Sequence, residues 1–384
     1  MIIVADANIV DVAENYQQHG ELRLLNGRAI APGDVADADA LLVRSITPVN
    51  AALLEKSRVR FVATATSGTN HLDLDYLKAR QIQVCDAAGS NANAVVEYVL
   101  CALAELPQEG AKVALGLGPV GIVGYGHVGK RLHEQLRALG IATRLCDPFV
   151  AADYPGLSFC SLEEIMACPI VSLHTPLTHE GPYPTLHMLD ERMLSRLPES
   201  AVLINAARGE LIDTAVLTTF LRQRPDVQSI VDCWEGEPLI STALLNLVRL
   251  GSPHIAGYSQ QAKRSASQAN YRSFLEFFRL HDARYRQPVE AGRLVLRVPT
   301  PTRTDSLQQL ATILRQVFAV REIDTRLRGA GEGANAALFD GIRRDLGSRQ
   351  EFSAYTLDLS GWAEAQRSQA ILGHLRALGF SLSC

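Results

Sequence analysis

Short apolar runs alternate with longer amphipathic segments along most of the chain. Such runs predict buried strands at Met1–Ala5, Ala40–Ser45 and Arg60–Thr66. Further runs of the same kind lie at Ile82–Cys85, Val120–Gly124, Ile141–Cys146, Ile170–His174, Ala201–Asn205 and Ser229–Val231. Between them, apolar residues recur at helical spacing, as at Leu72–Arg80 and Asn93–Leu106. This alternation favours parallel α/β sheets, which bind ligands at the carboxyl ends of their strands.

One of these strands leads directly into a glycine-rich turn. Val120–Gly124 is followed by Gly124-Tyr-Gly126-His-Val-Gly129, and apolar residues then recur at helical spacing as far as Gly140. A strand, G-x-G-x-x-G, a helix and a second strand form the context of a dinucleotide-binding turn. The glycines allow a tight bend and a close approach of the pyrophosphate, and the helix N-terminus attracts its charge. The predicted cofactor-binding residues of this turn are Gly124, Gly126, His127, Val128 and Gly129.

An acidic residue follows the second of these strands. Asp147 stands 23 residues after Gly124, close to the separation of about 20 expected for the carboxylate that binds ribose hydroxyls. Because its charge would repel a 2′-phosphate, the sequence predicts NAD rather than NADP. The alternative interpretation is a tight βα turn that binds no ligand.

The bulk composition narrows the class of protein. With 384 residues the chain exceeds a single hydrophobic core, so two or three domains are expected. A net charge of −4 gives no basic surface for nucleic acid or membranes, and no apolar run approaches the ~18 residues of a membrane span. The start of the chain lacks the basic region of a signal peptide. The seven scattered cysteines include no C-x-x-C, which favours free thiols in the cytoplasm over disulfides or a metal site.

The later part of the chain differs from the rest. Ser259–Leu280 predicts one long helix that returns to the first domain. From residue 287 to the end the sequence is rich in arginine and contains no lysine. Strands are predicted at Arg293–Val298 and Tyr355–Leu359, and helices at Leu307–Val320 and Glu364–Leu378. These elements predict a small α+β domain.

Three candidate reacting groups lie downstream of the glycine-rich turn. Arg208 follows a predicted strand, Glu237 stands five residues after Asp232, and His254 stands 17 residues after Glu237. Histidine is suited to take a hydroxyl proton, and a carboxylate behind it fixes its tautomer. An arginine can hold a substrate carboxylate by two hydrogen bonds. By spacing alone, each residue is equally open to a structural role in a salt bridge, a turn or the surface.

Five motifs resemble the D-isomer-specific 2-hydroxyacid dehydrogenase family. They are Gly124-Tyr-Gly-His-Val-Gly129, Leu173-His-Thr-Pro-Leu177, Ile204-Asn-Ala-Ala-Arg-Gly209, Asp232-Cys-Trp-Glu-Gly-Glu-Pro238 and Pro253-His-Ile-Ala-Gly257. The resemblance implies NAD-dependent oxidation of a 2-hydroxy acid, with Arg208, Glu237 and His254 as catalytic residues. It also implies NAD contacts at Asp147, Thr175, Ala206, Ala207, Arg208, Asp232 and Gly257, with Asp232 facing the carboxamide.

Further motifs resemble those members of the family that oxidise a phosphorylated substrate and carry an extra C-terminal domain. They are Val43-Arg-Ser-Ile-Thr47, Ala65-Thr-Ser-Gly-Thr-Asn-His-Leu-Asp73, Ser90-Asn-Ala-Asn93, Gly181-Pro-Tyr183 and Ala256-Gly-Tyr-Ser259. This implies Ser45, Thr66 and Tyr258 at the substrate and a homodimer formed by the C-terminal domain. Next to Ser45, Arg44 is the best nearby candidate for binding the phosphate.

The predicted fold is α/β, with two doubly wound parallel-sheet domains and a small C-terminal α+β dimerisation domain. A flavodoxin-like substrate domain comprises residues 1–92 and 258–286, a Rossmann NAD domain residues 93–257, and the dimerisation domain residues 287–384. Two alternatives stay open. One is a dehydrogenase for another 2-hydroxy acid, such as phosphoglycerate or glycerate, and the other is a non-catalytic, NAD-sensing regulator.

Overall fold

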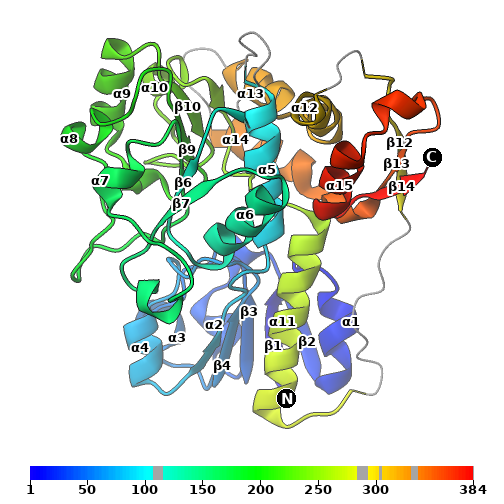
Figure 1. Ribbon diagram of the computed structural model, residues 1–384. Helices are drawn as coiled ribbons and strands as arrows, with labels where there is room; N and C mark the ends of the chain where they lie inside the picture. The colour runs from blue at the N-terminus through cyan, green and yellow to red at the C-terminus, as the bar shows by residue number, and fades with distance from the viewer. Residues whose placement is uncertain (107–115, 283–292, 302–304, 330–335, 384) are drawn as a thin grey trace. The chain divides into compact units, whose positions relative to one another are not determined.

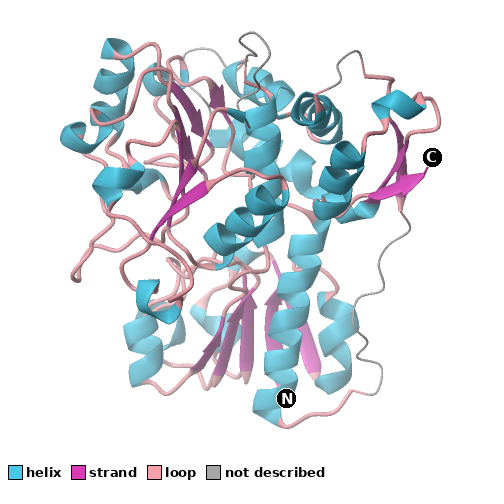
Figure 2. Ribbon diagram, viewed as in Figure 1, coloured by secondary structure: helices cyan, strands magenta, loops and turns pink. Residues whose placement is uncertain are grey.

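The computed structural model describes residues 1–106, 116–282, 293–301, 305–329 and 336–383. The chain divides into two compact units, one of Met1–Ala92 with Ser259–Val289 and one of Asn93–Tyr258 with Glu290–Cys384. The strands of the described residues form three parallel sheets (Figure 2). The predicted α/β class with doubly wound parallel sheets is therefore confirmed, whereas the division into three domains stays a prediction.

The first unit is built on a five-stranded sheet in the order β2-β1-β3-β4-β5, the order of flavodoxin-like folds. Its strands are β1 (Ile2–Asp6), β2 (Glu21–Leu25), β3 (Ala40–Val43), β4 (Phe61–Thr64) and β5 (Gln83–Cys85). Successive side chains point to opposite faces. Val4, Leu41 and Val62 therefore pack with α2 (Pro32–Val35), α3 (Ala51–Leu54) and α4 (Leu74–Ala79). Ile3, Leu42 and Phe61 pack on the other face, with α1 (Val12–Tyr16) and α11.

The predicted long helix after Tyr258 is α11 (Gln260–Phe278). Its first turn is capped by Ser259, whose hydroxyl accepts a hydrogen bond from the Ala262 N–H at 2.9 Å. Tyr271 and Phe274 are buried against Tyr16 of α1, with ring centroids 5.1 and 5.0 Å from the Tyr16 ring. The helix thus belongs to the core of the first unit, although more than 150 residues separate it in sequence from β5.

The second unit contains a six-stranded sheet in the order β11-β10-β9-β8-β6-β7. The strands are β6 (Val120–Val123), β7 (Thr143–Cys146), β8 (Ile170–Leu173), β9 (Val202–Asn205), β10 (Gln228–Val231) and β11 (Leu250–Gly251). An isolated bridge between Leu145 and Phe159 adds a one-residue strand beside β7. Counting that bridge, the first six strands along the chain lie in the order 3-2-1-4-5-6 of dinucleotide-binding folds. The order reverses between β6 and β8, which defines the expected ligand crevice.

Helices of the second unit connect these strands. They are α5 (Ala92–Ala104), α6 (His127–Ala138), α7 (Leu162–Ile165), α8 (Glu191–Leu194), α9 (Thr214–Gln223) and α10 (Thr242–Leu245). All four residues of β6, β8 and β9 are buried, which explains why these strands are continuous apolar runs in the sequence. In the described residues, no helix combines the length and the apolar character that crossing a membrane requires.

The C-terminal part of the second unit has a sheet of its own. The strands β12 (Leu294–Arg297), β13 (Tyr355–Asp358) and β14 (Ser381–Ser383) pair in parallel. They are accompanied by α12 (Ser306–Val317), α13 (Val320–Arg328), α14 (Ala336–Asp345) and α15 (Gln369–Ala377). The helix predicted over Leu307–Val320 is divided, because Phe318 adopts an extended conformation between α12 and α13 and packs near Tyr98.

Arginines of this C-terminal part bind the rest of the second unit. Arg315 donates to the Ala104 carbonyl at the end of α5 at 3.0 Å, and Arg321 donates to the backbone and side chain of Glu105. Arg328 donates to the carbonyls of Leu245 and Val248, just before β11. Figure 1 shows α5 beside α12, which it also contacts through Cys101. The arginine-rich composition therefore serves contacts within the chain.

Candidate active site

The glycine-rich turn has the geometry of a pyrophosphate cradle. Gly124 has a φ of +95°, which only glycine adopts freely. A Cβ atom on Gly129 would lie 1.9 Å from the Gly124 carbonyl oxygen, so α6 can pack this closely on β6 only because Gly129 has no side chain. By contrast, a Cβ on Gly126 would meet no described atom within 4 Å. The open side of the turn lies at Gly126, at the N-terminus of a 12-residue helix where an anion is favoured.

Asp147 and Thr175 lie on either side of this turn. Asp147 follows β7, and its carboxylate accepts hydrogen bonds from the Tyr125 N–H at 2.8 Å and the Phe149 N–H at 3.1 Å. Each carboxylate oxygen keeps further acceptor capacity for a hydroxyl. Thr175 follows β8, and its hydroxyl oxygen is buried with no hydrogen-bond partner among the described residues. These features fit a dinucleotide, with the hydroxyl acceptor, the phosphate cradle and an unsatisfied buried donor at one sheet edge.

Backbone hydrogen bonds join the carboxyl ends of the next three strands. The Asp232 N–H donates to the Asn205 carbonyl at 2.9 Å, and the His254 N–H donates to the Asp232 carbonyl at 2.7 Å. These bonds extend the pairing of β9, β10 and β11 beyond the strands themselves. The loops that carry Arg208, Glu237 and His254 therefore start from adjacent, hydrogen-bonded positions.

Asp232 anchors the loop that carries His254. Its carboxylate is fully buried and accepts from Ser252 Oγ at 2.6 Å, the Ile255 N–H at 2.8 Å and the Ala256 N–H at 2.9 Å. Ser252 in turn lies 2.7 Å from the Tyr98 hydroxyl of α5. The pKa of Asp232 is raised above its usual value, because burial outweighs the opposing effects of His254 and the three hydrogen bonds. The contact of Asp232 with a nicotinamide carboxamide stays a prediction.

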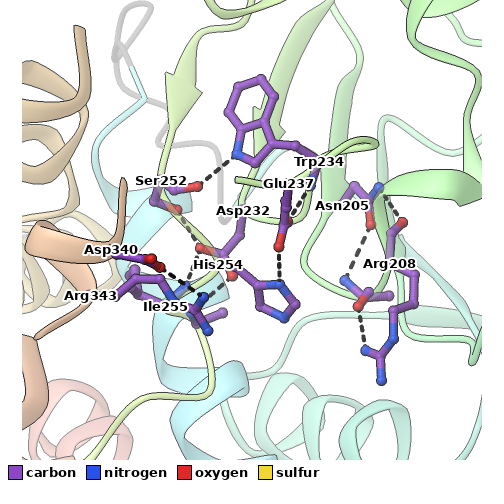
Figure 3. A network of polar contacts seen from close by, with 12 residues as sticks. Asn205, Arg208, Asp232, Trp234, Glu237, Ser252, His254, Ile255, Asp340 and Arg343 are labelled. Carbon is purple, nitrogen blue, oxygen red and sulfur yellow. Dashed lines mark hydrogen bonds and ion pairs between the residues drawn. The ribbon is translucent and has the colours of Figure 1, made fainter. Parts of the chain in front are cut away.

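Glu237 and His254 form a hydrogen-bonded pair (Figure 3). His254 Nδ1 lies 2.7 Å from one Glu237 oxygen, and the other oxygen accepts from the Trp234 N–H at 2.7 Å. A carboxylate accepts only, so Nδ1 carries a proton and Nε2 is the ring nitrogen that can take up another. Burial disfavours the charged ring, but the Cys233 sulfur and the Glu237 carboxylate outweigh it, and the pKa of His254 is raised well above its usual value.

Arg208 caps the short 3-10 helix at Gly209–Leu211, directly after β9. The Asn205 side chain holds this turn by donating to the Arg208 carbonyl at 2.8 Å and accepting from the Ala207 N–H at 3.2 Å. Gly209 allows the turn to approach the next loop, since a Cβ there would lie 1.9 Å from the Trp234 carbonyl carbon. Figure 3 shows the Arg208 guanidinium extending from these strand ends beside the Glu237–His254 pair. Ala206 and Ala207, in the same turn, are buried.

The substrate-binding candidates of the first unit lie at the ends of β3 and β4. Arg44 forms an ion pair with the fully buried Asp6 at the end of β1, with 2.8 Å between Arg44 Nε and Asp6 Oδ2. The sheet order reverses between β1 and β3, so this pair stands where a ligand crevice is expected. Ser45 is exposed beside it. The Thr66 hydroxyl lies 2.8 Å from that of Thr64 and donates to the Gly68 carbonyl at 3.2 Å.

Tyr258, the substrate candidate of the second unit, contacts the C-terminal part of the chain. Its hydroxyl accepts from Arg343 of α14 at 2.8 Å, and the Arg343 guanidinium also lies 5.1 Å from the centre of the Tyr258 ring. Gly257, between Ala256 and Tyr258, is partly exposed. Sequence analysis missed Arg343 and Tyr98, because no local motif marks residues that meet the site from distant elements. It also missed Ser252, which stands two residues before His254.

Among the described residues, two groups of side chains have the spacing of metal ligands. The ligand atoms of Cys233, Glu237 and His254 lie within 4.8 Å of one another, as do those of His187, Asp213 and Glu235. In the first group Glu237 already accepts from the His254 ring and from the Trp234 N–H, which engages both of its oxygens. In the second, Asp213 caps α9 and Glu235 accepts from the Thr214 N–H. Neither arrangement calls for a metal ion.

The comparison with known sequences identifies the family. Residues 109–256 match the NAD-binding domain of the D-isomer specific 2-hydroxyacid dehydrogenases. The erythronate-4-phosphate dehydrogenase of Azotobacter vinelandii is 42% identical, with 99% of each chain covered. That of Cellvibrio japonicus is 41% identical, with 96% of this chain and 97% of the relative covered. That of Pseudomonas syringae pv. syringae is 40% identical over 99% of both chains.

Solved structures of this family have the same fold. The NAD+-bound 3-phosphoglycerate dehydrogenase of Entamoeba histolytica is similar with a TM-score of 0.61 and 24% identity, over 73% of this chain and 95% of that one. The D-lactate dehydrogenase of Aquifex aeolicus has a TM-score of 0.61 and 22% identity, over 73% and 96%. The chain therefore belongs to the erythronate-4-phosphate dehydrogenases, within the D-isomer specific 2-hydroxyacid dehydrogenase family, and is an NAD-dependent oxidoreductase.

Proposed function

We propose that the chain oxidises 4-phospho-D-erythronate at C2 with NAD, giving (R)-3-hydroxy-2-oxo-4-phosphobutanoate in pyridoxal 5′-phosphate (vitamin B6) synthesis. The substrate is inferred from relatives named erythronate-4-phosphate dehydrogenase, which match nearly the whole chain. The observation that carries the chemistry is the Glu237–His254 pair, at the same sheet edge as the dinucleotide turn. A non-catalytic NAD sensor would have no need of this pair.

Each proposed catalytic residue has a distinct task. His254 Nε2 takes the proton of the C2 hydroxyl, and Glu237 fixes the tautomer and stabilises the imidazolium that forms. Arg208 holds the substrate carboxylate through its guanidinium. When bound, NAD supplies the acceptor for the hydride from C2. Gly124, Gly126, His127, Val128 and Gly129 would hold its pyrophosphate, and Asp147 its ribose hydroxyls.

The remaining assignments belong to the same proposal. Thr175, Ala206, Ala207, Asp232 and Gly257 complete the NAD site, and Ser45, Thr66 and Tyr258 contact the substrate, with Arg44 nearest to its phosphate. Arg44 is paired with Asp6, so it would share its charge between that carboxylate and the phosphate. The substrate domain would comprise residues 1–92 and 258–286. The NAD domain would comprise residues 93–257, and the dimerisation domain residues 287–384. The six described cysteines are free thiols, which is compatible with a location in the reducing cytoplasm.

Formation of NADH from 4-phospho-D-erythronate tests this proposal, with D-3-phosphoglycerate and D-glycerate as competing substrates. We expect the four-carbon phosphate to have the highest kcat/KM. Preference for either competitor would overturn the substrate assignment, and absence of turnover with all three would overturn the reaction.

Replacement of His254 tests the catalytic assignment. We expect His254→Ala to lower kcat by roughly 10²–10⁴-fold, as loss of a general base does. His187→Ala is a matched control, because His187 also forms a 2.7 Å pair with a glutamate, Glu235, but lies outside the proposed site. Equal activity of the two variants would remove His254 from the mechanism.

A further inference from the structure

The backbone that carries His254 is strained and needs support. His254 has a φ of +52°, in the left-handed region that only a few per cent of residues other than glycine adopt. Such a conformation persists only where surrounding contacts determine it. On one side, Asp232 holds the Ile255 and Ala256 N–H groups. The carbonyls of the peptides that follow are held by a side chain from the C-terminal part of the chain.

Arg349, in the segment after α14, binds this loop through its backbone. Its side chain is buried, and its Nη1 donates to the Ala256 carbonyl at 3.0 Å and to the Tyr258 carbonyl at 3.5 Å. Its Nη2 donates to the Ala94 carbonyl of α5 at 2.9 Å. The guanidinium therefore joins α5 to the two carbonyls that flank Gly257.

The guanidinium of Arg349 is itself fixed in place. Its Cζ lies 4.1 Å from the centre of the Phe318 ring, and its Nη2 lies 3.6 Å from a Glu97 oxygen. The other Glu97 oxygen accepts from the Phe352 N–H at 2.9 Å. A planar guanidinium held by a ring and a carboxylate fixes the directions of its hydrogen bonds to these carbonyls, whereas the compact ammonium of a lysine on its flexible stem does not.

Arg343 of α14 binds the side chain at the end of the same loop. It donates to the Tyr258 hydroxyl at 2.8 Å and lies 3.9 Å from Asp340, one turn earlier in the helix. Phe339 of α14 packs on the same guanidinium, 5.8 Å from ring centre to Cζ. Figure 3 shows Arg343 and Asp340 beside the loop of His254 and Ile255. One C-terminal arginine thus holds the loop backbone and a second holds its tyrosine.

We propose that Arg343 and Arg349 are positioning residues, through which the C-terminal part of the chain fixes His254 and Tyr258 of its own active site. This inference rests on the proposed function, since it assigns to His254 the proton transfer and to Tyr258 the substrate contact. It gives the C-terminal part a role in catalysis that does not depend on dimer formation.

The first test compares Arg349→Lys with Arg326→Lys. The control residue lies in the same part of the chain, but its ion pair with Asp345 is exposed. Both changes keep the charge, but Arg349→Lys removes the planar fork whose two terminal nitrogens bind the Ala256 and Ala94 carbonyls. We expect Arg349→Lys to lower kcat by roughly ten- to a hundred-fold, as small displacements of reacting groups do. Arg326→Lys should have wild-type activity.

The pH profile separates positioning from mere stability. The groups that set the charge of His254 are Glu237, Cys233 and Asp232. If Arg349 keeps the His254 ring hydrogen-bonded to Glu237, the apparent pKa in the pH profile of kcat/KM should be lower in Arg349→Lys than in the wild type. An unchanged pKa together with unchanged kcat would overturn the proposal for this residue. Loss of wild-type turnover with every substrate would instead overturn the proposed function itself.

The second test uses Arg343, which is only half-buried, so its replacement should leave the fold intact. Arg343→Met and Tyr258→Phe each remove one side of their hydrogen bond. If Arg343 acts through the Tyr258 hydroxyl, the double variant should lose no more kcat/KM for 4-phospho-D-erythronate than the more damaging single variant. Additive losses, or wild-type activity of Arg343→Met, would contradict a positioning role.

Discussion

At the scale of the residue, His254 depends on its neighbours for both its position and its proton affinity. The ring nitrogen bonded to Glu237 is protonated, and the raised pKa means that the free ring nitrogen binds a second proton readily. Only the neutral ring can accept the proton of a substrate hydroxyl. The rate of substrate oxidation should therefore be highest at pH values above the pKa of His254, and it should fall as the pH is lowered through that pKa.

Removal of the Glu237 charge should move this pH dependence. In Glu237→Gln the imidazolium loses its stabilising carboxylate, so the pKa of His254 falls and the rise of kcat/KM shifts to lower pH. The measurement is a pH–rate profile with a constant buffer composition. Glu235→Gln is the control, because Glu235 is a close neighbour that binds His187 instead. If the pH–rate profile of Glu237→Gln is the same as that of the wild type, a group other than His254 controls the pH dependence of the rate.

The Asp147 carboxylate should determine the choice of cofactor. Asp147→Asn keeps one oxygen to accept a backbone N–H but removes the charge that repels a 2′-phosphate. We expect the ratio of the Kd values for NADPH and NADH to fall by about ten-fold, which corresponds to roughly 1.4 kcal/mol. Titration of protein fluorescence with each cofactor gives both constants. An unaltered ratio would remove Asp147 from cofactor selection.

Sequence analysis located these residues because each follows an apolar strand. Arg208 and His254 stand three residues after β9 and β11, and Asp147 immediately follows β7. Arg343 and Arg349 have no such local context, since their partners lie in a loop some 90 residues earlier. Nothing in their own segment predicts that contact. Long-range contacts of this kind are the part of the site that only a structure provides.

At the scale of the element, glycine has two different roles in the turn between β6 and α6. Gly129 is required for packing, because a Cβ there would overlap the Gly124 carbonyl. A Cβ atom on Gly126 would meet no described atom within 4 Å, and its φ of −76° is one that any residue can adopt. Its small size therefore matters only if a ligand approaches it.

Two alanine substitutions test this difference. We expect Gly126→Ala to weaken NADH binding by about ten-fold or more, because the added methyl group occupies the path of the pyrophosphate, and to leave Tm nearly unchanged. Gly129→Ala should lower Tm by several degrees, since the overlap forces α6 away from β6. Calorimetry and NADH titration of both variants measure these effects. A loss of stability in Gly126→Ala equal to that in Gly129→Ala would contradict the assignment.

Burial explains why the central strands were predicted from the sequence. The central strands β3, β4, β6, β8 and β9 are buried throughout, so their apolar runs stand out in the sequence. The edge strands β2, β11 and β14 were missed. The strands β2 and β14 carry partly exposed or polar residues, such as Glu21 and Ser381, and β11 has only two residues. Pairing with one neighbour sets their conformation, and a local pattern does not show it.

At the scale of the whole molecule, the C-terminal part combines an inward and an outward surface. Its inward arginines bind α5 and the loops around β11, as described above. Its outward surface includes the edge strand β12, where Leu294 and Val295 are 48% and 73% exposed. Exposed apolar residues on an edge strand favour association with another chain. This surface supports the proposed homodimer.

A charge on β12 should therefore break the dimer. We expect the wild-type chain to have twice the mass of one chain in light scattering, and Val295→Asp to have the mass of one, because an unpaired carboxylate in an apolar interface is costly to desolvate. Leu239→Asp is the control, since Leu239 is 71% exposed but lies outside the C-terminal part. A dimeric Val295→Asp variant would place the interface elsewhere. If the monomer keeps its turnover, the arginines that hold His254 act within one chain, and association adds stability without completing the site.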